Sequence, residues 1–165
     1  MKIYLLEDKD SYRLKMEIAL TATFPESVDI FCSGNDVDFP RQIISDWKKG
    51  VLSEDCIVIL DIELPSISYF GHWCKKNDSV EVVQKSEFGR VKFENAIVHG
   101  WNIYYLIRAL SRKIRIVVVS SHPLNEMKKH IDGNQLPEVN SEYFLYIYRD
   151  MSSKEIIKVI VDHFK

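Results

Sequence analysis

The sequence predicts a doubly wound α/β domain built on five parallel strands, and three observations predict it. The 165 residues are 46% hydrophobic, which is enough to bury one core and suits a single domain over residues 1–165. Short β-branched runs alternate along the chain with longer segments of helical spacing, as in repeated strand–crossover–strand units. Two of the runs are apolar at nearly every position, which is typical of central strands covered on both faces.

Five apolar runs are the expected strands. They lie at residues 3–6, 28–32, 56–60, 114–119 and 144–148. The third and fourth of these runs are the most continuously apolar, so we expect them at the centre of the sheet.

Helical segments fall between the expected strands. They lie at residues 11–23, 40–49, 103–110, 123–131 and 152–164. Asp10 or Ser11 is expected to cap the first helix, and Pro40 lies in the first turn of the second. Ser152 and Glu155 have the spacing of a capping box, so they predict where the last helix begins.

One segment interrupts this alternation. Residues 66–99 form an insertion that a simple strand-to-helix connection does not need. Residues 80–82 and 91–93 alternate in polarity around Gly89, which favours a small β-hairpin. The aromatic content of the insertion leaves three roles open: a lid over the neighbouring site, a dimer or partner surface, or a decoration that buries its own side chains.

The charge balance limits the classes of partner. The chain has 22 Lys and Arg against 24 Asp and Glu, a formal net charge of -2. It therefore lacks the basic footprint of a nucleic-acid-binding domain or of a protein that binds anionic membranes. No apolar stretch reaches the roughly 20 residues that a bilayer span requires. We expect a cytoplasmic protein whose 3 cysteines, which cannot all pair within the chain, are reduced.

Polar residues follow four of the expected strands. Glu7 and Asp8 follow the first strand, Asp61 the third, Ser120 the fourth and Arg149 the fifth. Because the carboxyl ends of parallel strands meet at one edge of a sheet, we expect these side chains to lie together. Three crowded carboxylates repel one another, and Mg²⁺, which prefers oxygen ligands, relieves that repulsion. The pattern therefore indicates formation and hydrolysis of an aspartyl phosphate on one of these carboxylates.

This ordered set of motifs resembles the receiver domain of two-component response regulators. In that family an acidic pair follows the first strand, as Glu7 and Asp8 do here. The family's phosphoacceptor is followed four residues later by Pro, as Asp61 is by Pro65. Its switch hydroxyl after the fourth strand corresponds to Ser120. The resemblance covers nearly the whole chain except the insertion.

The resemblance also implies a strand order of 2-1-3-4-5 and further site residues. The family's switch aromatic, three residues before its basic residue, corresponds to Tyr146, and the basic residue to Arg149. Mg²⁺ is the implied cofactor, and four residues are implied to bind it: Asp8 and Asp61 directly, Glu63 by its backbone carbonyl, and Glu7 through water.

The partners are likewise implied by the resemblance. A sensor histidine kinase or a phosphotransfer protein would donate the phosphoryl group to Asp61. A downstream protein would then bind the face formed by the fourth helix, the fifth strand and the last helix. Such a domain is a phosphoacceptor rather than a turnover enzyme, with no nucleic acid or membrane as its partner, and a homodimer remains open.

Glu63 and His122 occupy positions at which receiver domains tune the lifetime of the phosphorylated state. Glu63 lies two residues past Asp61, and His122 lies two residues past Ser120. Two interpretations stay open. Either the pair positions or excludes an attacking water, or both are polar residues of the rim.

Arg149 departs from the family, which has Lys at this position. The planar guanidinium cannot occupy the same space as a compact ammonium, and Asp150 offers a partner that would hold Arg149 away from the site. An alternative function is therefore a receiver-like interaction module that is never phosphorylated. A phosphatase of the haloacid dehalogenase type is rejected, because Glu63 stands where that family needs Asp and the acidic pair comes first.

Overall fold

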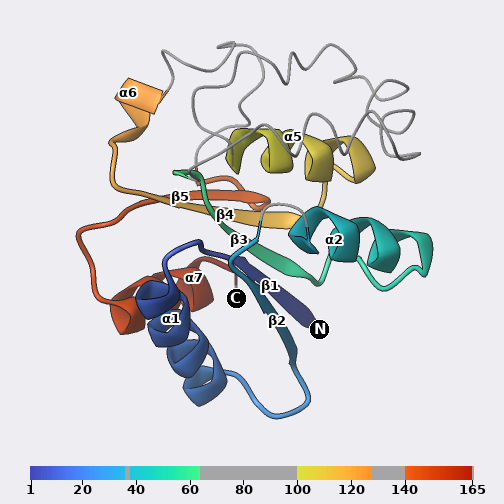
Figure 1. Ribbon diagram of the computed structural model, residues 1–165, viewed down its shortest axis with the longest axis horizontal. Coiled ribbons are helices and arrows are strands. Elements are labelled where there is room, and N and C mark those ends of the chain that lie inside the picture. The colour runs from blue at the N-terminus through green and yellow to red at the C-terminus, as the bar shows by residue number, and fades with distance from the viewer. Residues whose placement is uncertain (36–37, 64–99, 128–139, 165) are drawn as a thin grey trace.

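The predicted fold class is confirmed. The computed structural model of the chain describes residues 1–35, 38–63, 100–127 and 140–164. Within these residues five parallel strands form one sheet in the order β2-β1-β3-β4-β5 (Figure 1). The insertion over residues 66–99 and its expected hairpin lie outside the described residues.

All five expected strands are present. They are β1 (Lys2–Leu6), β2 (Asp29–Ser33), β3 (Ile57–Asp61), β4 (Arg115–Ser120) and β5 (Phe144–Tyr148). The middle three lie one residue later than predicted, because each includes the polar residue at its carboxyl end. Asp61 pairs with Val119 and Ser120 with Tyr148, so backbone pairing continues past the last apolar side chain.

The described helices follow the predicted pattern. They are α1 (Asp10–Thr23), α2 (Asp38–Lys48), α5 (Gly100–Leu110), α6 (Leu124–Met127) and α7 (Ser153–Phe164). The capping box is confirmed, because the Ser152 N–H donates to the Glu155 carboxylate and the Glu155 N–H donates to the Ser152 hydroxyl. The expected helix at residues 123–131 is described only over α6.

The prediction that Asp10 or Ser11 caps the first helix is wrong. Lys9 is the N-cap residue, and its side chain makes no capping hydrogen bond. Asp10 is already helical, so its carboxylate lies in the first turn, where the helix dipole favours a negative charge. There it forms an ion pair with Arg13.

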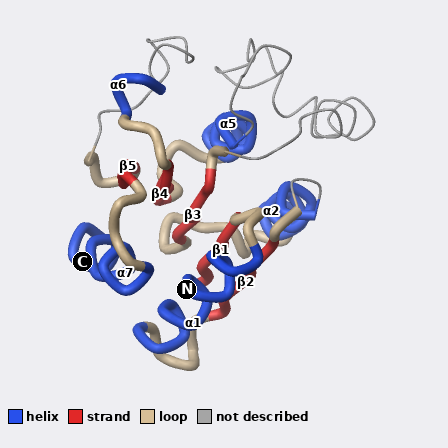
Figure 2. Tube along the Cα trace, turned by 60° about the vertical axis from the view of Figure 1, so that its left-hand side comes forward, coloured by secondary structure: helices blue, strands red, loops and turns tan. Residues whose placement is uncertain are grey.

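Helices cover both faces of the sheet (Figures 1 and 2). On one face, α1 and α7 pack Met16, Leu20, Ile156 and Ile160 against the strands. On the other, α2 and α5 bury Phe39, Ile43, Trp101 and Tyr104. Among the described helices, none is both long enough and apolar enough to cross a membrane.

Arg108 in α5 aligns the beginnings of two strands. Its side chain is almost fully buried and donates hydrogen bonds to the backbone carbonyls of Ile114, at 2.7 Å, and Arg112, at 2.9 Å, as well as to that of Tyr143. Ile114 immediately precedes β4 and Tyr143 immediately precedes β5. These bonds satisfy a buried cation and hold the two strands in register, which in turn places their carboxyl ends side by side.

Gly100 brings the chain back beside Asp61 after the insertion. Its N–H donates to the Ile62 carbonyl at 3.2 Å. A Cβ atom at this position would lie 2.3 Å from the Ile62 Cα and 2.5 Å from the Asp61 carbonyl oxygen, so only glycine fits. The described residues on either side of the insertion, Glu63 and Gly100, therefore both adjoin the end of β3.

A buried acid, Asp46, anchors α2 to β1. Its carboxylate accepts hydrogen bonds from the Tyr4 hydroxyl at 2.8 Å and the Gln42 amide at 3.0 Å. It also lies 3.0 Å from the Lys2 ammonium, which forms a second ion pair with the exposed Asp29. Burial disfavours the charged carboxylate, but the hydrogen bonds to its three partners outweigh burial and lower the pKa of Asp46.

We predict that Asp46→Ala lowers the free energy of unfolding by about 2–3 kcal/mol, because it leaves the Tyr4 hydroxyl and the Lys2 ammonium without their buried partner. The matched control Asp29→Ala removes the exposed partner of Lys2 and should cost less than about 0.5 kcal/mol. Urea denaturation measures both values. Equal losses for the two variants would contradict the assigned role of Asp46.

Because the pKa of Asp46 is lowered, its contribution to stability depends on pH. The contribution of Asp46 to stability is fully present above the ordinary pKa of Asp, near 3.8, and is lost as the pH falls through the lower pKa of the folded state. Below pH 4 the difference in unfolding free energy between the wild type and Asp46→Ala should therefore shrink.

Candidate functional site

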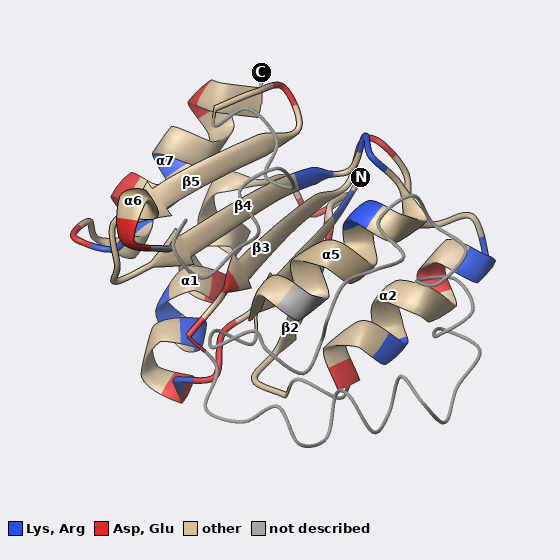
Figure 3. Cartoon of the chain, turned by 90° about the horizontal axis from the view of Figure 1, so that it is seen from above, with Lys and Arg blue, Asp and Glu red and all other residues tan. Residues whose placement is uncertain are grey.

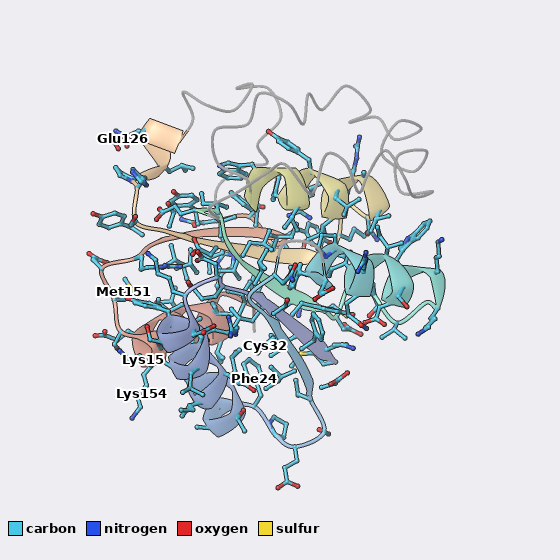
Figure 4. All side chains as sticks on the ribbon, viewed as in Figure 1. Lys15, Phe24, Cys32, Glu126, Met151 and Lys154 are labelled. Atoms are coloured by element: carbon cyan, nitrogen blue, oxygen red, sulfur yellow. The ribbon has the colours of Figure 1, made fainter. Side chains whose placement is uncertain are left out.

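The candidate site lies at the edge of the sheet where the strands end. Glu126 in α6 and Met151 after β5 lie on this side of the molecule (Figure 4). Acidic residues lie near the end of β3 (Figure 3), and Glu7 and Asp8 directly follow β1. The topology explains this arrangement, because all five strands are parallel and their carboxyl ends therefore face the same way.

Arg149 points into the acidic cluster. Its Nη2 lies 2.6 Å from Glu7 Oε2 and 3.1 Å from Asp61 Oδ2, and its side chain is only 6% exposed. The guanidinium also lies over the ring of Tyr12 in α1, 4.8 Å from the ring centroid. The alternative in which Asp150 holds Arg149 away from the site is therefore wrong.

Burial dominates the electrostatics of the two carboxylates that Arg149 contacts. Burial, together with the negative charge of Asp61, raises the pKa of Glu7 to about 7, although Arg149 opposes the rise. Burial likewise raises the pKa of Asp61, again against the effect of Arg149. The positive charge of Arg149 therefore does not fully offset the cost of burying the two negative charges of Glu7 and Asp61.

The residues present suit a divalent cation such as Mg²⁺. Glu7, Asp8 and Asp61 each place one carboxylate oxygen within 4.8 Å of the others. Among the described residues, Asp8 Oδ1 is a buried oxygen without a hydrogen-bond partner, and Asp61 Oδ2 has the ion pair with Arg149 but no hydrogen bond of good geometry. A buried carboxylate oxygen without a donor is costly, and a hard cation with oxygen ligands would satisfy it.

A second cluster surrounds the carboxylate of Glu63. This carboxylate accepts hydrogen bonds from the Ser120 hydroxyl at 2.8 Å and from the N–H and hydroxyl of Ser121 at 2.7 Å and 2.6 Å. It also lies 2.9 Å from Nδ1 of His122. Burial would raise the pKa of Glu63, but hydrogen bonds from these three partners outweigh burial and lower the pKa to about 2. Glu63 is therefore ionised throughout the physiological range.

The two clusters are joined through the backbone. The N–H of Glu63 donates to Asp61 Oδ1 at 3.0 Å, and the N–H of Arg149 donates to the Ser120 carbonyl at 2.7 Å. Ser120 is fully buried. Tyr146 donates its hydroxyl to the His122 carbonyl at 2.7 Å, so the aromatic residue also contacts the loop after β4.

The predicted site residues thus lie in two adjoining groups. Glu7, Asp8, Asp61 and Arg149 form the first, whereas Ser120 and Tyr146 lie in the second, around Glu63. Whether the Glu63 carbonyl binds a metal stays a prediction. Sequence reasoning missed Tyr12, although its place four residues after Asp8 puts it on the first helical turn above the site. It also missed that the Glu63 side chain would hold the Ser120 hydroxyl.

Comparisons with known proteins support the fold. No family model matches the sequence, and no curated protein sequence matches it. A response regulator receiver protein from Sinorhizobium medicae is 17% identical with a TM-score of 0.55, over 99% of this chain and 94% of that one. A chemotaxis response regulator from Vibrio cholerae is 10% identical with a TM-score of 0.51, over 98% and 97%.

A two-component transcriptional regulator from Clostridium phytofermentans is 8% identical with a TM-score of 0.51, over 99% of this chain and 91% of that one. At such low identities the similarity establishes the fold alone. The predicted resemblance to receiver domains is therefore confirmed for the architecture, and the chain has the receiver fold.

We predict that Arg149→Met lowers the free energy of unfolding by about 3–5 kcal/mol in the absence of metal, because it leaves two buried carboxylates without their cation. Arg149→Lys retains the charge and should lose less. The control Arg41→Met removes an exposed cation that pairs with Asp38 in α2, and should change stability by less than about 0.5 kcal/mol. Unfolding in urea measures all three, and an Arg149→Met variant as stable as Arg41→Met would contradict this role.

Proposed function

We propose that this chain is a signalling switch that accepts a phosphoryl group on Asp61. The observation that carries the proposal is the Asp61 side chain. It is almost fully buried at a strand end, next to two further carboxylates, and its Oδ2 lies 3.1 Å from the Arg149 guanidinium. A carboxylate in this setting is a nucleophile that needs positive charge around it before it can approach a phosphoryl group.

The chain's own residues have separate tasks in this proposal. Glu7, Asp8, Asp61 and the Glu63 carbonyl would hold Mg²⁺, which supplies positive charge against the oxygens of the phosphoryl group. An Asp61 oxygen forms the new O–P bond while the N–P bond of a phosphohistidine donor breaks, and the departing imidazole nitrogen takes up a proton. The Arg149 guanidinium, already at Asp61, would hold a phosphoryl oxygen.

The proposed partners follow from the same chemistry. The donor is a sensor histidine kinase or a phosphotransfer protein, and the chain acts as a phosphoacceptor rather than a turnover enzyme. Output would pass through the face of α6, β5 and α7, where Tyr148 and Met151 expose large apolar side chains. Tyr146 adjoins this face and contacts the loop after Ser120, which supports a path from the site to the surface.

The second candidate is a receiver-like interaction module that is never phosphorylated. A specific observation favours it: the Arg149 guanidinium is already paired with both Glu7 and Asp61, so it partly compensates the carboxylates without a metal. The buried Asp8 Oδ1, which has no hydrogen-bond partner among the described residues, weighs against it, because a binding-only domain gains nothing from burying this oxygen beside two further carboxylates.

We predict that incubation with Mg²⁺ and acetyl phosphate adds a single phosphoryl group, observed by intact-mass spectrometry. Asp61→Asn should abolish the adduct because it removes the nucleophilic oxygen, whereas the control Asp55→Asn, an exposed residue of the loop before β3, should retain it. Some receivers accept phosphate only from a kinase, so trifluoroberyllate with Mg²⁺ serves as a second probe. Absence of an adduct together with absence of trifluoroberyllate binding would favour the interaction module.

A further inference from the structure

The Ser120 hydroxyl already has an acceptor. It donates to Glu63 Oε1 at 2.8 Å, and its oxygen accepts the His122 N–H at 3.0 Å. A serine hydroxyl has one proton, so it can donate one hydrogen bond at a time. Ser120 is fully buried, whereas the Glu63 side chain is 18% exposed, so Glu63 is the partner with access to water.

We propose that Glu63 is a positioning residue that competes with the phosphoryl group for the Ser120 hydroxyl. The inference rests on the proposed function of Asp61. When Asp61 carries a phosphoryl group, Ser120 exchanges the Glu63 carboxylate for a phosphoryl oxygen. Glu63 thereby favours the unphosphorylated arrangement and sets how readily the switch is occupied.

The geometry of the loop after β4 supports this exchange. The same Glu63 carboxylate accepts hydrogen bonds from the N–H and hydroxyl of Ser121 and contacts His122. In the arrangement in which Glu63 binds Ser120, it therefore also fixes the next two residues of the loop. Hydrogen bonds to a charged acceptor are the stronger ones, so losing one from Ser120 has a measurable cost. The Glu63 side chain can remain bound to Ser121 after Ser120 leaves it.

The two acceptors that compete for the Ser120 hydroxyl, the Glu63 carboxylate and a phosphoryl group on Asp61, belong to residues only two positions apart. The Glu63 N–H donates to Asp61 Oδ1 at 3.0 Å, so the competing carboxylate belongs to the residue that also binds the phosphoacceptor. A phosphoryl group on Asp61 would bring further negative charge toward Glu63. Repulsion between the two adds to the competition for Ser120, and the experiment must separate these contributions.

The test is the affinity for trifluoroberyllate in the presence of Mg²⁺, measured by fluorine NMR. We expect Glu63→Gln and Glu63→Ala to bind the probe about 5- to 30-fold more tightly than the wild type, because Ser120 no longer leaves a charged acceptor. The matched control Glu26→Gln, an exposed acid in the loop before β2, should bind as the wild type does. A residue with a merely structural role would weaken binding when removed, not strengthen it.

A double-mutant cycle separates the hydrogen bond from the charge. If Glu63 acts through Ser120, then the gain from Glu63→Gln should shrink in a Ser120→Ala background to the part that is due to charge repulsion, whereas a pure charge effect would persist there in full. Persistence of the full gain would overturn the exchange. Unchanged or weaker binding by Glu63→Gln would overturn it as well.

The outcomes also distinguish this inference from the proposed function. If the wild type binds the probe and Glu63→Gln shows no gain in affinity, only the proposed exchange is refuted. If neither the wild type nor any variant binds the probe, both the proposed function and the exchange are refuted. Far-ultraviolet circular dichroism and urea unfolding of each variant show whether the fold is retained.

Discussion

Glu7 and Asp61 are each only 2% exposed, and at this burial their carboxylates repel each other strongly. Arg149 places a positive charge between them and thereby holds this edge of the sheet together. The contact joins the ends of β1, β3 and β5, which are far apart in the sequence. Tyr12 adds α1 to the same contact through its ring. The compensation is incomplete, since burial still raises the pKa of both carboxylates, and the site is therefore suited to a further cation.

Two neighbouring clusters have separate roles in the proposed switch. The first, around Arg149, gathers the carboxylates that would hold Mg²⁺ and accept the phosphoryl group. The second, around Glu63, holds the loop after β4 in its present arrangement. Because Asp61 belongs to the first cluster and Glu63 to the second, the proposed switch would pass a change at Asp61 to the contacts of Ser120. Tyr146 extends that contact toward the outer face.

The fold could be predicted from the sequence because its strands are short apolar runs and its last helix begins with a capping box. The gathering of Glu7, Asp8 and Asp61 could also be predicted, since parallel strands bring their carboxyl ends to one edge. The direction of the Arg149 side chain could not be predicted. It depends on whether the guanidinium pairs with Asp150 or with the two buried acids, and only the tertiary structure decides this. The hydrogen bonds of Arg108 and Asp46 were equally hidden, since their partners are backbone carbonyls or distant residues that no local pattern reveals.

The central claim is that Glu7, Asp8 and Asp61 form a site for a divalent cation, and NMR with Mn²⁺ as a paramagnetic stand-in for Mg²⁺ tests it most directly. The account predicts that small amounts of Mn²⁺ selectively broaden the amide signals of residues 7, 8, 61 and 63, and that excess Mg²⁺ restores them. Broadening centred instead on exposed acids such as Glu54, or weak broadening spread over the whole chain, would contradict the account.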